Sequence, residues 1–166
     1  MKRAIILLFM IFVSTSVFSQ NLNFSSSFKR GQIGGDSDYM YRGVGIILGE
    51  PSGITGIVYL SRTYAIDGAV SWDLREKGFL HVHGDLLFHD FDKFSVDKGE
   101  MAFYYGLGGF VHLSDKGRVG IRIPMGIKYF FEDSPFSIFF EAAPNLKLLP
   151  DIDVLVNLFV GIRYLF

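Results

Sequence analysis

Three of the four histidines have a spacing that raises the question of a metal site. His81 and His83 are two residues apart, so on a strand their side chains share one face, and His112 falls on the next expected strand. Imidazole is a common zinc ligand, but zinc needs a third and usually a fourth ligand converging at about 2 Å. The sequence does not give the pairing register, and we expect neither a metal nor a cofactor.

A second chemistry to weigh is hydrolysis by a serine that a histidine and a carboxylate activate. His81, His83 and His89 lie close to Asp85 and Asp90, but the nearest serine downstream, Ser95, falls in a polar loop. We therefore expect no catalytic residues.

Most of the polar side chains alternate with apolar ones, which predicts strands. The segment 118–130 is the clearest, with Val119, Ile121 and Ile123 on one face and Arg122 and Lys128 on the other. Eight such segments, separated by turn residues, are expected: 42–49, 54–60, 64–74, 79–89, 102–113, 118–130, 136–145 and 154–166.

The faces opposite the apolar ones carry the titratable residues, and we expect them to form a paired polar network inside a closed barrel, because buried charges persist when they are paired. The expected members are Asp67, Asp73, His81, His83, Asp85, His89, His112, Arg122, Lys128, Glu141, Asn157 and Arg163. Glu141 is the first candidate partner for Arg122 or Arg163, because the strands on either side of its own carry these two residues.

Export is indicated at the N-terminus. Lys2 and Arg3 precede a short apolar run and a small-residue exit, which predicts a cleaved signal peptide over residues 1–19. The apolar run is too short for a spanning helix, which needs about 20 residues. We expect residues 20–41 to lead into a barrel formed by 42–166.

Composition favours a membrane barrel. The chain has 18 Phe, 8 Tyr and 19 Gly, and its net charge of −1 gives no reason to expect a nucleic-acid partner. Apolarity is spread over alternate residues, as in transmembrane barrels. The fold class we predict is all-β: an eight-stranded antiparallel up-and-down transmembrane β-barrel.

An even strand number places both chain ends on the periplasmic side, and the long polar connection from Asp90 to Glu100 with them. Leu146 to Asp153 is expected to link the last two strands, and Pro124 to mark a bulge or a rim position. The aromatic residues expected at the bilayer interfaces are Trp72, Phe88, Phe103, Tyr129, Phe136 and Tyr164.

The last strand resembles the C-terminal strand of bacterial outer-membrane barrels, which the barrel-insertion machinery reads as a signal. The matching positions are Leu158, Val160, Ile162, Tyr164 and Phe166.

A wider resemblance covers about residues 42 to 166. The stretches 45–53, 104–109, 120–124 and 161–164 are similar to the spirochaete-type family of small OmpA-like outer-membrane β-barrel proteins, also found in other Gram-negative-type bacteria. The resemblance implies the architecture and brings no catalytic residues with it.

The function we expect is that of an integral protein of the cell outer membrane, monomeric and non-enzymatic, with a structural or surface-interaction role. Its expected partners are outer-membrane lipid and the insertion machinery, and a surface ligand is left open. Two alternatives remain: a periplasmic or secreted lipocalin-like barrel that binds a small ligand, and an outer-membrane enzyme that modifies lipid A.

Overall fold

A computed structural model describes residues 41–72, 80–113 and 117–166. The proposed signal peptide (1–19) and all but the last residue of the segment 20–41 lie outside the described residues. None of the described residues belongs to a helix of the length and apolar character that crossing a membrane requires.

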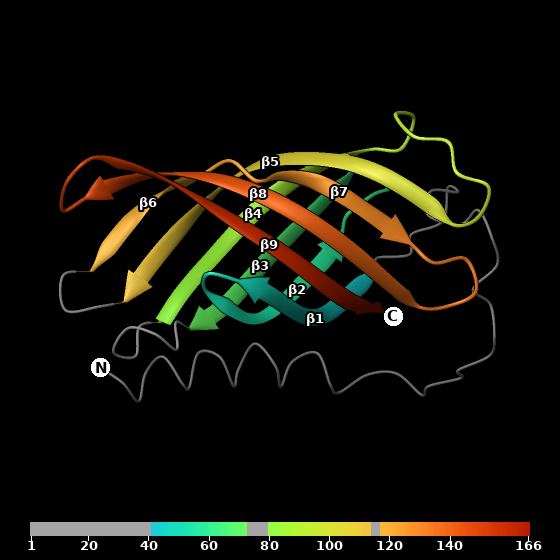
Figure 1. Cartoon of the computed structure of the whole chain (residues 1–166), viewed down its shortest axis with the longest axis horizontal. Coiled ribbons are helices and arrows are strands. Elements are labelled where there is room, and N and C mark those ends of the chain that lie inside the picture. The colour runs from blue at the N-terminus through green and yellow to red at the C-terminus, as the bar shows by residue number, and fades with distance from the viewer. Residues whose placement is uncertain (1–40, 73–79, 114–116) are drawn as a thin grey trace.

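The described residues form nine β-strands (Figure 1). They are β1 (Arg42–Gly49), β2 (Ser52–Tyr59), β3 (Tyr64–Trp72), β4 (Leu80–Asp90), β5 (Glu100–Leu113), β6 (Arg118–Arg122), β7 (Met125–Phe130), β8 (Phe136–Leu149) and β9 (Asp153–Leu165).

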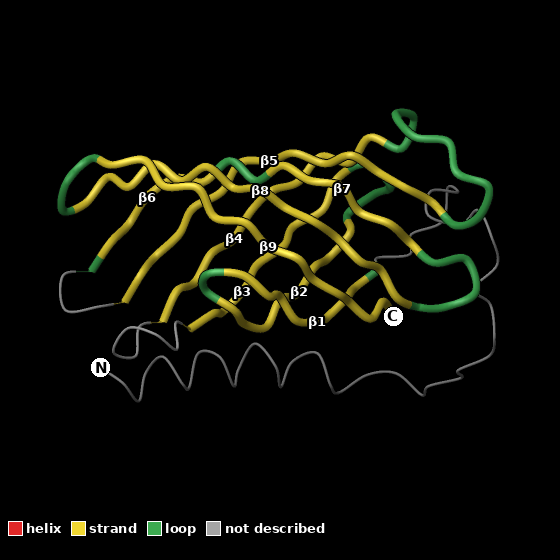
Figure 2. The backbone as a smooth tube through the Cα atoms, in the orientation of Figure 1, coloured by secondary structure: helices red, strands yellow, loops and turns green. Residues whose placement is uncertain are grey.

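The strands make one closed antiparallel ring. Apart from β6 and β7, each strand pairs with its neighbours in sequence, and β9 returns to pair with β1, through the register Gly43↔Leu165 to Gly49↔Phe159. β6 and β7 both lie between β5 and β8, so they are two halves of one strand position (Figure 2). The predicted eight-stranded up-and-down barrel is therefore confirmed.

Pro124 separates β6 from β7 without shifting the register. Gly108↔Arg122 and Tyr105↔Met125 belong to one continuous pairing with β5. Gly106 N donates to the Pro124 carbonyl over 2.8 Å, but proline has no N–H to return the second bond of that pair. The bulge expected at Pro124 is thus absent, and Pro124 is buried rather than at a rim; the irregularity lies between Val119 and Gly120, against β8.

The register also fixes the tilt of the strands. Successive partners around the ring are Gly43, Ile57, Asp67, Asp85, Gly108, Arg122, Asn145 and Leu155. Continuing the β1–β9 register brings Leu155 opposite position 53, ten residues beyond the starting Gly43. Eight strands with this stagger, at about 3.3 Å per residue and about 4.7 Å between strands, tilt by about 40° from the barrel axis.

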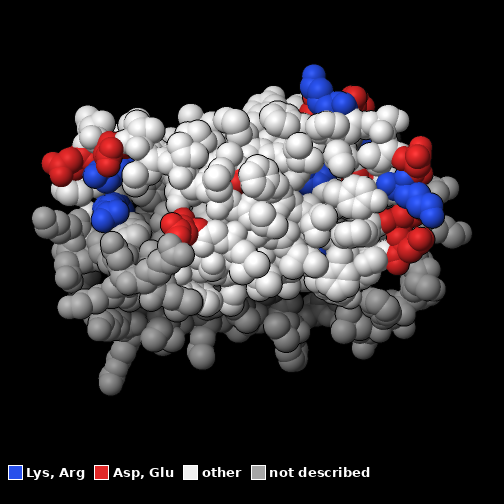
Figure 3. All heavy atoms as spheres, viewed as in Figure 1, with Lys and Arg blue, Asp and Glu red and all other residues white. Residues whose placement is uncertain are grey.

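Apolar side chains point outward and charged ones inward. Arg122 and Lys128 are fully buried, whereas Ile121 and Ile123 are 41% and 47% exposed. Charged side chains on the face shown in Figure 3 gather toward the two ends of the barrel. This is the reverse of a lipocalin-like barrel, whose apolar face lines the inside.

The long connection lies at the end of the barrel where β1 begins and where the chain ends at Phe166, which we call the terminus end. The connections 60–63, 91–99 and 131–135 lie at this end, beside the pair Arg42 and Phe166, and the turns at Glu50–Pro51 and 150–152 lie at the other end (Figure 1). The expected link Leu146 to Asp153 was too long, because β8 continues to Leu149 and β9 begins at Asp153. β2 runs over Ser52–Tyr59 rather than 54–60.

Aromatic side chains surround the terminus end. Phe88 contacts Tyr64 and Tyr105, with ring centroids 5.6 and 5.1 Å apart, and Phe136 contacts Tyr164 at 5.4 Å. Of the six aromatics expected at interfaces, five are near this end, and Trp72 is at the other.

Candidate functional site

The centre of the barrel is an ion-paired cluster around Arg122. Its Nε lies 2.9 Å from Oδ2 of Asp85 on β4, and its Nη2 bonds Oε1 of Glu141 on β8. Arg122 and Asp85 are 0% and 3% exposed as whole residues. One guanidinium therefore joins carboxylates from two strands, and Glu141 pairs with one of the two arginines considered from the sequence.

The contact between Asp85 and Arg122 depends on a glycine between them. Gly108 pairs with Asp85 on one side and with Arg122 on the other. A Cβ at Gly108 would lie 1.8 Å from Oδ1 of Asp85 and 2.3 Å from the backbone oxygen of Gly84. Only a residue without a side chain leaves room for the two charged groups to meet.

The same arrangement joins Glu141 to Tyr104. Gly126 pairs with both residues, and the Tyr104 hydroxyl donates to Oε2 of Glu141 over 2.9 Å. A Cβ at Gly126 would lie 2.7 Å from the Tyr104 hydroxyl oxygen. Tyr104 thus supplies the second oxygen of Glu141 with a donor.

A second ion pair holds Arg163, whose strand closes the ring. Gly45 pairs with Arg163 and with Thr55, and Nη2 of Arg163 donates to Oγ1 of Thr55 over 2.7 Å. The same nitrogen lies 2.6 Å from Oδ2 of Asp67. The Arg163 guanidinium also lies over the Phe139 ring, 4.2 Å from its centroid, so a fully buried cation has a carboxylate, a hydroxyl and an aromatic face around it.

Among the described residues, no carboxylate lies within hydrogen-bond range of Lys128. Its Nζ donates to the Tyr59 hydroxyl over 2.9 Å and lies 3.0 Å from Nε2 of His89. The Tyr104 ring is also close, its centroid 4.9 Å from the nitrogen. This cluster lies nearer the terminus end than Arg122.

The histidines considered for zinc are brought together. The ring centroid of His81 lies 5.7 Å from that of His83 and 5.9 Å from that of His112, while Nε2 of His83 is 4.0 Å from Oδ2 of Asp85. Within the described residues, no three His, Asp or Glu side chains converge as a metal site requires.

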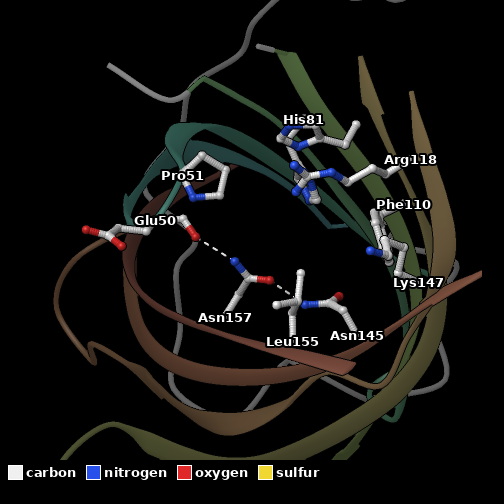
Figure 4. Close-up of a pocket in the computed structure, with 10 residues that line it drawn as sticks. Glu50, Pro51, His81, Phe110, Arg118, Asn145, Lys147, Leu155 and Asn157 are labelled. Carbon is white, nitrogen blue, oxygen red and sulfur yellow. Dashed lines mark hydrogen bonds between the residues drawn. The ribbon is translucent and has the colours of Figure 1, made fainter. Parts of the chain in front are cut away.

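Beyond His81, at the end opposite the termini, lies a pocket of about 210 Å³ (Figure 4). It is lined by Glu50, Pro51, His81, Phe110, His112, Arg118, Asn145, Lys147, Leu155 and Asn157. Asn157 bonds Asn145 and donates to the backbone oxygen of Glu50, so this member of the expected network lies at the barrel mouth.

Some residues of the interior network were missed in the sequence. Thr55, Tyr59, Tyr104 and Asn145 are buried and bonded to it. Their positions could have identified them as inward-facing, since residues of one strand whose numbers differ by an even number share a face. Asp73, expected in the network, lies outside the described residues.

The hydrolase residues considered are not gathered around a serine among the described residues. His89 is buried beside Lys128, whereas Ser95 is exposed on the 91–99 connection. The sequence also contains His112-Leu113-Ser114, in which a histidine precedes a serine by two; Ser114 lies outside the described residues, and His112 lines the pocket described above.

The expected insertion-signal residues point outward along β9. Leu158, Val160 and Ile162 are 55%, 53% and 40% exposed, and Phe166 is 61% exposed. Tyr164 is partly covered, with Phe166 stacked on it at 6.3 Å between centroids. The backbones of Phe166 and Arg42 exchange hydrogen bonds of 3.0 and 2.8 Å, which closes the ring at the terminus end.

The closed ring, apolar exterior and charged interior define a small eight-stranded antiparallel β-barrel. Among solved structures, the chain is similar to the N-terminal β-barrel domain of Pseudomonas aeruginosa OprF, with a TM-score of 0.53 and 13% sequence identity. The match covers 78% of this chain and 98% of that domain. No protein-family model and no curated protein matches the sequence, so this likeness establishes the fold alone.

Proposed function

We propose that this chain is an integral outer-membrane barrel with a structural or surface-interaction role and no catalytic activity. The observation that carries the proposal is the barrel exterior, where aliphatic side chains stand exposed on every strand position. Leu48, Leu107 and Val160 are 60%, 62% and 53% exposed, each on a different strand. Such a surface is costly in water and is stable in lipid.

The dimensions fit a bilayer. A transmembrane strand tilted by about 45° needs about 9–11 residues. β4, β5, β8 and β9 have 11, 14, 14 and 13 residues, and β6 with β7 covers 118–130. β3, with 9 residues, is at the lower limit, and β1 and β2, with 8 each, are one residue short of it. The belt of Tyr and Phe near the terminus end fits a membrane–water interface.

The interior supports a structural role rather than a catalytic one. Arg122 is ion-paired with two carboxylates and Arg163 with one, so each arginine links its own strand to other strands of the barrel wall. Catalysis would need a nucleophile and a base in mutual reach, and His89 is engaged with Lys128 instead. An unchanged lipid A mass profile in a deletion strain is the expected result; loss of one lipid A species there would favour the enzyme alternative.

The proposal includes a biogenesis route and a family. We place the chain in the spirochaete-type group of small OmpA-like barrels, exported by a signal peptide over residues 1–19 and inserted as a monomer through recognition of its last strand. The outward-facing side chains of β9 support recognition of the last strand, because they lie on one continuous face.

Cell fractionation and a heat-modifiability gel test the location together. We expect the protein in the outer-membrane fraction, with different gel migration before and after boiling. A protein released by osmotic shock, with one migration under both conditions, would instead be the periplasmic ligand-binding barrel. A known periplasmic protein and a known outer-membrane barrel from the same cells serve as controls.

A further inference from the structure

The pocket at the end opposite the termini has the chemistry of an anion site. Two cations line it, Arg118 at the start of β6 and Lys147 near the end of β8. The only acidic residue lining it among the described residues is Glu50, and Figure 4 shows its carboxylate pointing away from the pocket. Asp153, 3.5 Å from Nζ of Lys147, is half exposed and does not line it.

Two buried side chains with hydrogen-bonding groups line the same pocket as these cations. His81 and Asn145 are 5% and 2% exposed, and both line the pocket. Nε2 of His81 and Oδ1 of Asn145 are buried, and neither has a hydrogen-bond partner among the described residues. Because an unsatisfied buried polar group is costly, a ligand that supplies hydroxyl groups would be favoured here.

The pocket also has apolar lining residues. The Phe110 ring is stacked against His81, with centroids 5.5 Å apart and planes 22° apart, and Leu155 and Pro51 line the pocket with it. An aromatic ring with aliphatic neighbours suits the C–H face of a sugar ring. The volume of about 210 Å³ is below that of sites for drug-sized molecules, so the occupant is small.

We propose that this pocket binds a phosphorylated monosaccharide. The phosphate dianion lies between Arg118 and Lys147, the sugar hydroxyls meet His81 and Asn145, and the ring packs on Phe110. A free sugar phosphate and the phosphorylated sugar of a lipid headgroup present the same chemistry. Because every lining residue except Glu50 and Pro51 belongs to a strand, the barrel itself forms the site, whatever the role of the outer surface.

Isothermal titration of the mature full-length barrel tests the proposal. The protein is folded in an amine-oxide detergent, which carries neither phosphate nor sugar, and titrated with glucose 6-phosphate, glucose or inorganic phosphate. The variant is Arg118→Gln with Lys147→Gln. The control is Lys93→Gln with Lys98→Gln, which removes two positive charges from the exposed connection at the other end.

We expect saturable 1:1 binding of glucose 6-phosphate that the pocket variant weakens roughly tenfold to a hundredfold and the control leaves unchanged. Absence of saturable binding, or equal binding by the pocket variant, overturns the proposal. Glucose binding as tightly refutes the anion site, and inorganic phosphate binding as tightly refutes the sugar site.

Folding and source need separate measurements. Every variant must show the heat-modifiable migration of the wild type. If the double variant does not, the titration of Lys147→Gln alone decides, because this side chain is at the mouth and is 15% exposed.

A competition experiment separates the two sources of the ligand. A purified phosphorylated lipid headgroup is added in competition: displacement of glucose 6-phosphate supports the lipid source, and no displacement supports the free sugar. A barrel that sits in the outer membrane but binds nothing would refute this site alone and leave the proposed function standing.

Discussion

Asp85 and Arg122 lie on strands that are not neighbours, and they form their 2.9 Å ion pair across Gly108. Glu141 and Tyr104 meet across Gly126, and Arg163 and Thr55 across Gly45, in the same way. Each glycine leaves a gap that two polar side chains fill from either side. The interior of the barrel is therefore stabilised by polar contacts that span three strands.

Gly108→Ala tests this arrangement most directly. Its Cβ would overlap Oδ1 of Asp85 and the backbone of Gly84, so we expect the ion pair with Arg122 to be displaced and the free energy of unfolding to fall by about 3 kcal/mol. Urea unfolding of the barrel in detergent, followed by heat-modifiable migration, measures the loss.

The neighbouring glycine is the matched control. A Cβ at Gly109 points outward and meets only the Gly120 backbone oxygen, at an ordinary 3.5 Å. Gly109→Ala should change stability by less than about 0.5 kcal/mol. Equal losses in the two variants would mean that the gap at Gly108 has no special role.

Glu141→Ala should destabilise the barrel by about 3–5 kcal/mol. The change leaves the Arg122 guanidinium with one carboxylate and the Tyr104 hydroxyl without its acceptor. Ser137→Ala, on the same strand and inward face, should cost less than about 1 kcal/mol, because the buried Oγ of Ser137 has no partner among the described residues. Similar unfolding midpoints for the two variants would contradict a central role for the pair.

The alternation of polar and apolar residues predicted most of the fold. Alternation over 118–130 predicted which side chains face lipid, because that property depends on residue parity alone. The end of β8 was predicted too early, at residue 145, although Asn145, Leu146, Lys147 and Leu148 continue the alternation of polar and apolar residues.

The pairing register of the strands could not be predicted from the sequence, and the contacts of the interior site depend on that register. Asp85 meets Arg122 only because Gly108 stands opposite both, and one residue of slip would turn these side chains outward. A bulge was expected at Pro124 because proline lacks an N–H, yet the register continues through Pro124, and the irregularity lies between Val119 and Gly120, against β8.

Lys128→Met should leave stability unchanged or raise it by about 1 kcal/mol. Lys128 is fully buried with a hydroxyl, an imidazole and ring faces as its partners, and an apolar side chain of similar length avoids the desolvation of a charge. Lys128→Ala removes most of the side-chain volume, and the cavity that it leaves should lower the free energy of unfolding by about 2–3 kcal/mol. Urea midpoints compare the two; a Met variant as unstable as the Ala variant would show that the charge itself stabilises the barrel.

Phe166→Gln should impair insertion more than stability. Only the backbone of Phe166 bonds Arg42, so ring closure survives the change, while the outward aromatic expected to be read by the insertion machinery is lost. We expect a near-normal urea midpoint after refolding and a severalfold lower amount in the outer membrane of cells. Phe131→Gln, an exposed aromatic at the same end but away from the last strand, is the control. An equal loss from both variants would point to interface anchoring rather than to a terminal signal.

Single cysteines on adjacent residues of β8 report which face meets lipid, and the natural chain has none to interfere. Ile138 is 42% exposed, and the next residue toward the N-terminus, Ser137, is fully buried. In lipid bilayers, a maleimide dissolved in the membrane should label Ile138→Cys rapidly and Ser137→Cys at least tenfold more slowly, because the thiol of the latter lies inside the barrel wall. Both should react alike after denaturation, which controls for intrinsic thiol reactivity. Faster labelling of Ser137→Cys in the folded state would mean that the charged face, with Arg122 and Lys128, is turned toward lipid, and the orientation on which the proposed function rests would be wrong.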